Sequence, residues 1–195
     1  MPSLQQVDIP ADVLSRARRG DAQAHECLYR VLSKPVYTLL RRLVIRPAIA
    51  EELLQDVFVE ILRSVARYNA TGSFVGWVRS IAVSKALMYL RSPWHRSLTW
   101  LAMDAERSSL EDPVTQSQEL FDTDLARALA DLPAISRTVV WLHDVEEMTH
   151  AEIAQLFGRS ISFSKSQLAR AHSELRDRLE SPVGGLACMP ISKNC

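Results

Sequence analysis

The sequence has few cysteines and few glycines, and both scarcities narrow the class of protein. Its three cysteines, Cys27, Cys188 and Cys195, are too few and too irregularly spaced for a disulfide framework or a zinc site. Only six glycines occur, and runs of the β-branched residues typical of strands are rare. We therefore expect reduced thiols and an all-α fold.

Long apolar runs and a secretory leader are also lacking. The opening stretch, MPSLQQVDIPADVL, has neither the basic start nor the apolar core of a signal peptide. No stretch is long enough in apolar residues to span a bilayer. These absences predict a cytoplasmic protein without membrane insertion.

The formal net charge is zero, which alone argues against a nucleic-acid partner. The charges are nevertheless unevenly distributed. Residues 1–97 carry 14 basic and 8 acidic side chains, residues 98–123 carry 1 and 6, and residues 124–195 carry 8 and 9. A basic front half is thus joined by an acidic connector to a nearly neutral back half. Because self-repulsion is small, we expect a compact free protein whose nucleic-acid surfaces are covered.

The histidines do not indicate an enzyme. They are scattered, no HExxH-like pair or Gly-rich phosphate loop occurs, and no nucleophile shares a motif with a base. The sequence therefore predicts no catalytic residue, no metal site and no cofactor. The five scattered histidines are His25, His95, His143, His150 and His172.

Residues 132–179 contain the pattern of a helix-turn-helix. Thr149 stands three residues before Glu152, which is the spacing of a capping box, so a short helix should begin at His150. Gly158-Arg159-Ser160 supplies the turn, and Ser160 can cap a second helix. Such a pair of helices is the shape that enters a DNA major groove, and an ordinary helical hairpin in a core is the alternative. The apolar positions of the second helix are Ile161, Leu168, Ala171, Leu175 and Leu179.

The front half predicts four helices. Ile9 to Val44 should form two, with a break at Gly20-Asp21 and a kink or reset at Pro35. A third begins at Pro47 and exposes an acidic face, and a fourth runs from Phe74 to Leu90. The loop between the last two can offer Asn69, Thr71 and Ser73 to a base, with Arg79 and Lys85 able to reach phosphates. The alternative for the nearby Phe74 and Trp77 is a place in the core.

Periodicity fades between Ser92 and Thr123, where prolines, serines and acids accumulate. We interpret the chain as two small helical domains, 1–91 and 124–180, joined by a flexible acidic linker at 92–123. Residues 181–195, which contain proline and glycine but no periodic face, are expected to be a mobile tail.

In this order the segments resemble the extracytoplasmic-function (ECF) sigma factors, a subfamily of the bacterial sigma-70 group. RARRGDAQAHECLYRVL is similar to the opening helices of the family, and AEELLQDVFVEIL to its polymerase-binding helix. SFVGWVRSIAVSKALMYLR is similar to the segment that handles the −10 promoter element. ALADLPAISRTVVWLHDVEEMTHAEIAQLFGRSIS is similar to the −35-reading domain. The resemblance covers residues 13 to 180.

The resemblance implies a protein that binds core RNA polymerase, directs it to promoter DNA and is controlled by an anti-sigma factor or another regulator. The loop from Arg67 to Ser73 would hold a flipped −10 base. Polymerase contact would fall to Glu51, Glu52, Gln55 and Asp56. The −35 element would be faced by Arg159, Ser162, Phe163, Lys165, Ser166, Gln167 and Arg170.

The sequence departs from the family pattern at several positions. Ile49 stands where an acidic residue is common, which implies a weaker or regulated polymerase contact. Ser164 stands where valine is usual, and Gln167 and His172 replace usual arginines, which together imply an unusual DNA site. Ser84 stands where asparagine is often found near the melted strand. The alternative from another class is a two-domain helix-turn-helix regulator, which would bind paired half-sites as a dimer.

Overall fold

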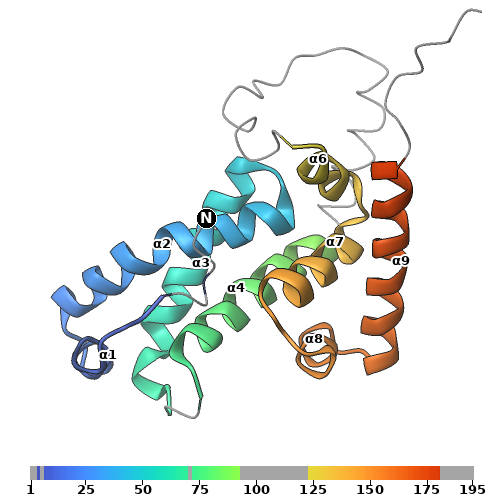
Figure 1. The fold of residues 1–195 in the computed structure, drawn as a ribbon. Coiled ribbons are helices and arrows are strands. Elements are labelled where there is room, and N and C mark those ends of the chain that lie inside the picture. The colour runs from blue at the N-terminus through green and yellow to red at the C-terminus, as the bar shows by residue number, and fades with distance from the viewer. Residues whose placement is uncertain (1–3, 5–6, 70–71, 93–122, 181–195) are drawn as a thin grey trace, which may run out of the picture.

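The structure is a computed structural model that describes residue 4 and residues 7–69, 72–92 and 123–180. Within these ranges the chain forms helices and no strand, so the predicted all-α class is confirmed. Figure 1 shows two groups of helices, which we call the front bundle (residues 7–92) and the back bundle (residues 123–180). The predicted flexible linker, apart from its two end residues, and the predicted mobile tail lie outside the described residues. No helix in the described ranges is long and apolar enough to cross a membrane.

The front bundle begins with a pair of helices divided where the sequence predicted. Helix α1 spans Ala11–Arg18 and α2 spans Ala22–Val44. Asp21 begins α2, because one of its carboxylate oxygens accepts the backbone N–H groups of Gln23 and Ala24 at 2.9 and 3.1 Å. A hydrogen bond from Arg16, followed by the bond from the Ala24 amide, lowers the pKa of Asp21 to about 2.

The sequence predicted that the helix kinks or starts anew at Pro35, and the predicted new start is wrong. Helix α2 continues through this residue to Val44, with Pro35 itself buried among the core residues of the bundle. Packing of a long apolar face offsets the loss of one helical hydrogen bond at proline. The helix instead ends at Ile45, whose φ of 60° is unusual for a β-branched side chain.

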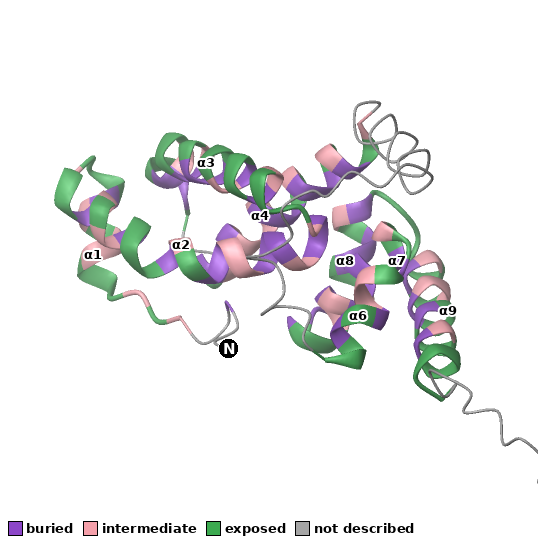
Figure 2. Ribbon diagram, turned by 90° about the horizontal axis from the view of Figure 1, so that it is seen from above, coloured by how far each residue is buried: buried purple, intermediate pink, exposed green. Residues whose placement is uncertain are grey.

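Helices α3 and α4 complete the front bundle. Helix α3 spans Pro47–Ser64, with its proline in the first turn where the missing N–H costs nothing, and a short 3₁₀ turn, η2, follows at Val65–Arg67. Helix α4 spans Phe74–Arg91, and Ser73 caps it by accepting the Gly76 N–H at 3.3 Å. In Figure 2 the buried residues of these helices line the surfaces where the helices meet.

The back bundle contains the predicted helix-turn-helix. Its helices are α6 (Asp124–Asp131), α7 (Ala134–Val140), a π-helical turn η5 (Trp141–Val145), α8 (His150–Phe157) and α9 (Ile161–Glu180). Thr149 and Glu152 form the expected capping box, and Gly158 adopts φ 60° at the end of α8. Ser160 caps α9 by accepting the Phe163 N–H at 3.2 Å.

The buried face of α9 differs from the predicted one at three positions. Leu168, Ala171 and Leu175 are buried as expected, but Ile161 and Leu179 are 49% and 46% exposed. Both exposed residues lie in the terminal turns of α9. Ser164 is fully buried and takes the place of an apolar residue on this face.

The two bundles contact each other directly. Helix α2 packs against α7, and α4 packs against α8, so residues far apart in sequence form one shared boundary. Figure 1 shows α4, in green, running beside the orange α7 and α8. The two bundles are thus in contact, as the expected compact protein requires, whereas the acidic connector that was part of this expectation lies outside the described residues.

Candidate nucleic-acid and partner interfaces

The acidic face predicted on α3 is present at the surface. Glu51, Glu52, Gln55 and Asp56 are all exposed, while Leu53 and Val57 on the opposite side are buried. Carboxylates on an exposed helix face are stable in water without a partner, so their charge alone does not establish a binding role. The structure shows in addition that three of these four residues, Glu52, Gln55 and Asp56, line a groove.

A groove of about 570 Å³ runs between this face and α4. Ile49, Glu52, Gln55 and Asp56 line it from α3, and Lys85, Met88 and Tyr89 line it from α4. Lys85 therefore lies beside the acidic face, away from the loop with which the sequence grouped it. Ile49, which replaces a common acidic residue, packs partly against the core and contributes apolar surface to the groove.

The loop between η2 and α4 is supported by an aromatic cluster of Tyr68, Phe74 and Trp77. Their ring centroids lie 5.2 to 5.4 Å apart, which is the range of favourable aromatic pairs. The Tyr68 hydroxyl donates a hydrogen bond of 2.7 Å to the Gly72 carbonyl, and Gly72 has a φ of 97°. The cluster thus orders the two ends of a loop whose centre, residues 70–71 with the candidate Thr71, lies outside the described residues.

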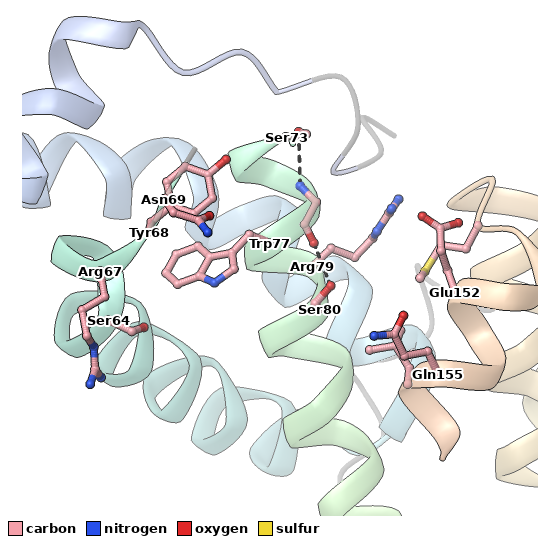
Figure 3. Close-up of a pocket in the computed structure, with 13 residues that line it drawn as sticks. Ser64, Arg67, Tyr68, Asn69, Ser73, Trp77, Arg79, Ser80, Glu152 and Gln155 are labelled. Carbon is pink, nitrogen blue, oxygen red and sulfur yellow. Dashed lines mark hydrogen bonds between the residues drawn. The ribbon is translucent and has the colours of Figure 1, made fainter. Parts of the chain in front are cut away.

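Beside this loop is a cavity of about 670 Å³, shown in Figure 3. It contains four of the predicted DNA-binding residues, Arg67, Asn69, Ser73 and Arg79. Its remaining walls include residues from both bundles: Ser64, Tyr68, Gly76, Trp77 and Ser80 on one side, and Met148, Glu152, Gln155 and Leu156 on the other.

Arg79 does not point freely into this cavity. One of its terminal nitrogens donates to the Glu146 carbonyl at 2.8 Å and lies 3.6 Å from the Glu146 carboxylate. Its side chain is only 14% exposed. In this arrangement Arg79 is therefore not available to a phosphate. Glu146 is buried, and this burial raises its pKa although Arg79 partly offsets the effect.

The predicted reading face of α9 divides into exposed and packed residues. Arg159, Ser162, Lys165 and Arg170 are exposed. Ser166 is half-buried and donates to the Phe163 carbonyl at 3.0 Å. The exposed group forms the part of this helix that can reach a nucleic acid without rearrangement.

Phe163 and Gln167 are held within the back bundle. The Phe163 ring packs against Phe157 with a centroid distance of 5.7 Å. The Gln167 carbonyl oxygen accepts a hydrogen bond of 3.0 Å from the Ser136 hydroxyl of α7. Both side chains thus contribute to packing, although the resemblance assigned them to the face that meets the −35 element.

Ser164 cannot be the source of an unusual DNA preference by direct contact. It is fully buried, and its hydroxyl lies 3.1 Å from the His150 imidazole. His150 stacks on His143 at 4.5 Å, and desolvation followed by the charge of His143 lowers the pKa of His150. The departure from valine therefore changes how α8 and α9 pack.

Comparison with known proteins identifies the family. The sigma-70 region 2 model matches residues 28–96, and the sigma-70 region 4 model matches residues 122–175. The chain is 31% identical over 170 residues to the RNA polymerase sigma factor CarQ of Myxococcus xanthus, covering 85% of this chain and 95% of CarQ. The chain belongs to the ECF sigma factors of the sigma-70 family.

Other ECF sigma factors are similar over most of the chain. Identity is 32% over 155 residues with ECF sigma factor SigE of Mycolicibacterium smegmatis, covering 78% of this chain and 60% of SigE. Identity is 26% with the ECF sigma-E factor of Haemophilus influenzae, covering 86% of this chain and 94% of that protein. As an ECF sigma factor, the chain is a transcription initiation factor of a class not known for catalysis.

Two solved structures share the fold of this sigma factor. CnrH in complex with the cytosolic domain of CnrY gives a TM-score of 0.56 at 19% identity, covering 88% of this chain and 97% of that chain. The sigma factor RpoE in complex with the anti-sigma factor NepR from Bartonella quintana gives a TM-score of 0.54 at 17% identity. The match covers 81% of this chain and 98% of that chain. At these identities the likeness establishes the helical architecture.

Sequence reasoning missed several residues around the cavity of this sigma factor. Ser64, Ser80 and Tyr68 were not singled out, although Tyr68 stands directly beside the predicted loop. The spacing Tyr68, Phe74 and Trp77 around a glycine-containing loop was the available signal. No comparable signal marked Glu152 and Gln155, because they reach the cavity only through contact between the bundles.

Proposed function

We propose that this sigma factor binds core RNA polymerase through the groove between α3 and α4, reads the −10 element at the loop after η2, and reads the −35 element with α9. The observation that carries the proposal is the cavity beside Trp77. On the front-bundle side of this cavity, aromatic rings stand beside basic and amide side chains, which suits a base removed from the stack.

The proposed polymerase contact rests on the composition of the groove. Glu52, Gln55 and Asp56 line the groove together with Met88, which is 68% exposed. An exposed methionine among charged residues is typical of protein interfaces. The acidic residues fit a basic partner surface, and an anti-sigma factor that covered the same groove would compete with polymerase.

The DNA-reading roles are assigned residue by residue. Arg67, Asn69, Thr71 and Ser73 would hold the −10 strand, and Arg79 would join them once it is released from Glu146. Lys85 is reassigned to the polymerase groove. The phosphate and base contacts to the −35 element would come from Arg159 in the turn before α9 and from Ser162, Lys165 and Arg170 on α9. Ser166 would lie behind them, and Phe163 and Gln167 would position the helix.

The proposal includes the remaining organisation of the chain. The segment 92–123 would be the connector between domains 1–91 and 124–180, with 181–195 as a tail. The protein would act in the cytoplasm, without a cofactor or metal and without catalysing a reaction itself. No group of three or more metal-ligating side chains is present among the described residues, a finding that leaves the proposal unchanged.

Run-off transcription tests the proposal directly. Purified core polymerase and the full chain would be incubated with genomic fragments, and the transcripts would be sequenced from their 5′ ends. We expect discrete start sites that require the chain, together with a monomeric chain in solution. A dimer that binds duplex half-sites and adds no transcripts would establish the regulator alternative instead.

Replacing Lys165 with alanine should weaken DNA binding by the same factor for promoter and non-promoter duplexes. Its exposed ammonium is expected to meet a phosphate, so the slope of log affinity against log salt should fall in magnitude by about 1. Arg176→Ala, an exposed change near the other end of α9, is the matched control and should leave affinity unchanged. Loss confined to promoter DNA would show that Lys165 contacts a base.

A further inference from the structure

A cluster of histidines joins three elements of the back bundle. Asp144 of η5 accepts a hydrogen bond of 2.8 Å from His143 Nδ1 and one of 2.6 Å from His172 Nε2 of α9. The His143 ring stacks on the ring of His150, the first residue of α8, with centroids 4.5 Å apart. We call these four residues the histidine cluster, and the promoter contacts proposed above include none of them.

The histidine cluster lies at one edge of the exposed face of α9. His172 follows Lys165 by about two helical turns, which places both side chains on the same side of the helix. Lys165 is exposed, and its charge acts on His150 at the start of α8. The cluster therefore borders the lysine that is proposed to meet a DNA phosphate.

His150 supports the cluster in its neutral form. Its Nδ1 lies 3.1 Å from the hydroxyl of the buried Ser164, so the ring is fixed between α8 and α9. Desolvation, followed by the charges of His143 and Lys165, lowers the pKa of His150, and the charge of Asp144 only partly offsets this. At neutral pH the ring is therefore an uncharged surface against which His143 packs.

His143 and His172 are the two imidazoles of the cluster that share the carboxylate. Their side chains are 34% and 45% exposed, and the Asp144 side chain is 36% exposed. Each ring uses one nitrogen to donate to Asp144, so its other nitrogen is the one that takes up a proton. A protonated ring keeps its bond to the carboxylate, now with opposite charges on the two partners, and gains a second donor.

The net charge of the cluster depends on these two protons. With both rings neutral, the Asp144 carboxylate makes the cluster negative. With both rings protonated, their positive charges exceed that of the single carboxylate, and the cluster becomes positive. Histidine is the side chain that ordinarily changes charge between about pH 5 and pH 8. A phosphate beside Lys165 would be repelled by the first state and attracted by the second.

We propose that His143, Asp144 and His172 form a proton-linked binding site for a backbone phosphate of duplex DNA at the edge of α9. When the phosphate binds, the two imidazoles take up protons from solvent and donate to phosphate oxygens, while Asp144 holds the rings in place. This inference rests on the proposed function, since it presumes that α9 lies against DNA. It adds a pH-dependent contact beside the permanent charge of Lys165.

The pH dependence of duplex binding tests the site. Fluorescence anisotropy would measure the affinity of the full-length chain for a labelled non-promoter duplex at constant salt, since phosphate contacts do not depend on sequence. Wild-type affinity should be about tenfold higher at pH 6 than at pH 8, as linkage requires if binding takes up about half a proton on average in this range. The slope of log affinity against log salt should be steeper by about 1 at pH 6, because a charged imidazole releases a counterion.

A double variant, His143→Gln with His172→Gln, removes the groups that take up protons. Glutamine can still donate to Asp144 but cannot change charge, so most of the pH dependence should be lost. His25→Gln is the matched control. It removes a half-buried imidazole of α2, whose Nε2 lies 2.8 Å from the Ala17 carbonyl, and should leave the pH dependence of the wild type unchanged.

Asp144→Asn separates the phosphate site from a purely structural role. Removing a negative charge beside the phosphate should raise affinity at pH 8 by about threefold, the size of one charge interaction at a solvent-exposed site. If Asp144 served only to hold η5 and α9 together, the same change would loosen α9 and weaken binding. The sign of the change at pH 8 therefore distinguishes the two roles.

Three results would overturn the site. Wild-type pH dependence in the double variant would show that other groups take up the protons. Weaker binding by Asp144→Asn at pH 8 would show that this carboxylate acts only in packing. An equal loss of pH dependence in His25→Gln would place the effect outside the histidine cluster. Failure of the wild-type chain to direct transcription would instead contradict the proposed function, and duplex binding would still decide whether the phosphate site exists.

Discussion

Replacing Glu52 with lysine should weaken the binding of core polymerase by roughly thirtyfold, or about 2 kcal/mol. Glu52 is exposed and lines the groove between α3 and α4, and charge reversal would replace attraction to a basic surface with repulsion. Close charge pairs that are desolvated in an interface are worth more than the roughly 1 kcal/mol typical of solvent-exposed pairs. Competition against a labelled sigma factor for purified core would measure the change.

The matched control is Glu26→Lys on α2. Glu26 is also exposed and lies outside the groove, and it forms an ion pair with Arg30 in the next turn. It makes the same change in net charge, so affinity should be within about threefold of wild type if the groove is the contact, a bound set by the small worth of surface pairs. Equal losses in the two variants would mean that polymerase responds to overall charge and not to this groove.

Arg137→Ala should lower the free energy of unfolding of the back bundle by about 3 kcal/mol. Arg137 is 7% exposed and donates to three carbonyl groups, those of Ala130, Leu132 and Leu43, at 2.9 to 3.0 Å. Burial lowers its pKa to about 10, so it remains protonated at neutral pH and keeps all its donors. Alanine would leave these carbonyls without their partner, and each buried group left unsatisfied costs about 1–3 kcal/mol.

Urea denaturation followed by far-ultraviolet circular dichroism would measure this loss. Arg127→Ala is the control, because Arg127 lies on the neighbouring α6 but is exposed and makes only an i,i+3 pair with Asp124. Its expected cost is under about 1 kcal/mol. A similar midpoint for the Arg137 variant and this control would show that water replaces the lost guanidinium without penalty.

Local chemistry explains which parts of the fold the sequence predicted. The capping box of Thr149 and Glu152, the left-handed Gly158 and the cap by Ser160 each depend on residues within three or four positions of one another. Such signals do not depend on tertiary packing and can therefore be recognised in a single sequence. The exposure of the acidic residues of α3 could also be predicted, because helical periodicity places them opposite the buried Leu53 and Val57.

Tertiary contacts explain what the sequence did not predict. Gln167 is bound by Ser136, 31 positions away, and Arg79 is bound by Glu146, 67 positions away. Helical spacing gives the direction of a side chain but not the element that will meet it. The end of α2 at Val44 was predicted, but the positive φ of Ile45 that follows it was not, since local rules favour glycine there. The candidate site was thus predicted as separate groups of residues, and its shared cavity was not.

The most direct measurement is binding to a promoter duplex, taken from the run-off experiment, by the chain alone, by core alone and by both together. The account predicts that the chain alone binds weakly and without preference for the promoter, because its −10 surface is covered. Chain and core together should form a heparin-resistant complex in which the −10 region becomes reactive to permanganate. Promoter-specific binding by the chain alone, unchanged when core is added, would contradict the account.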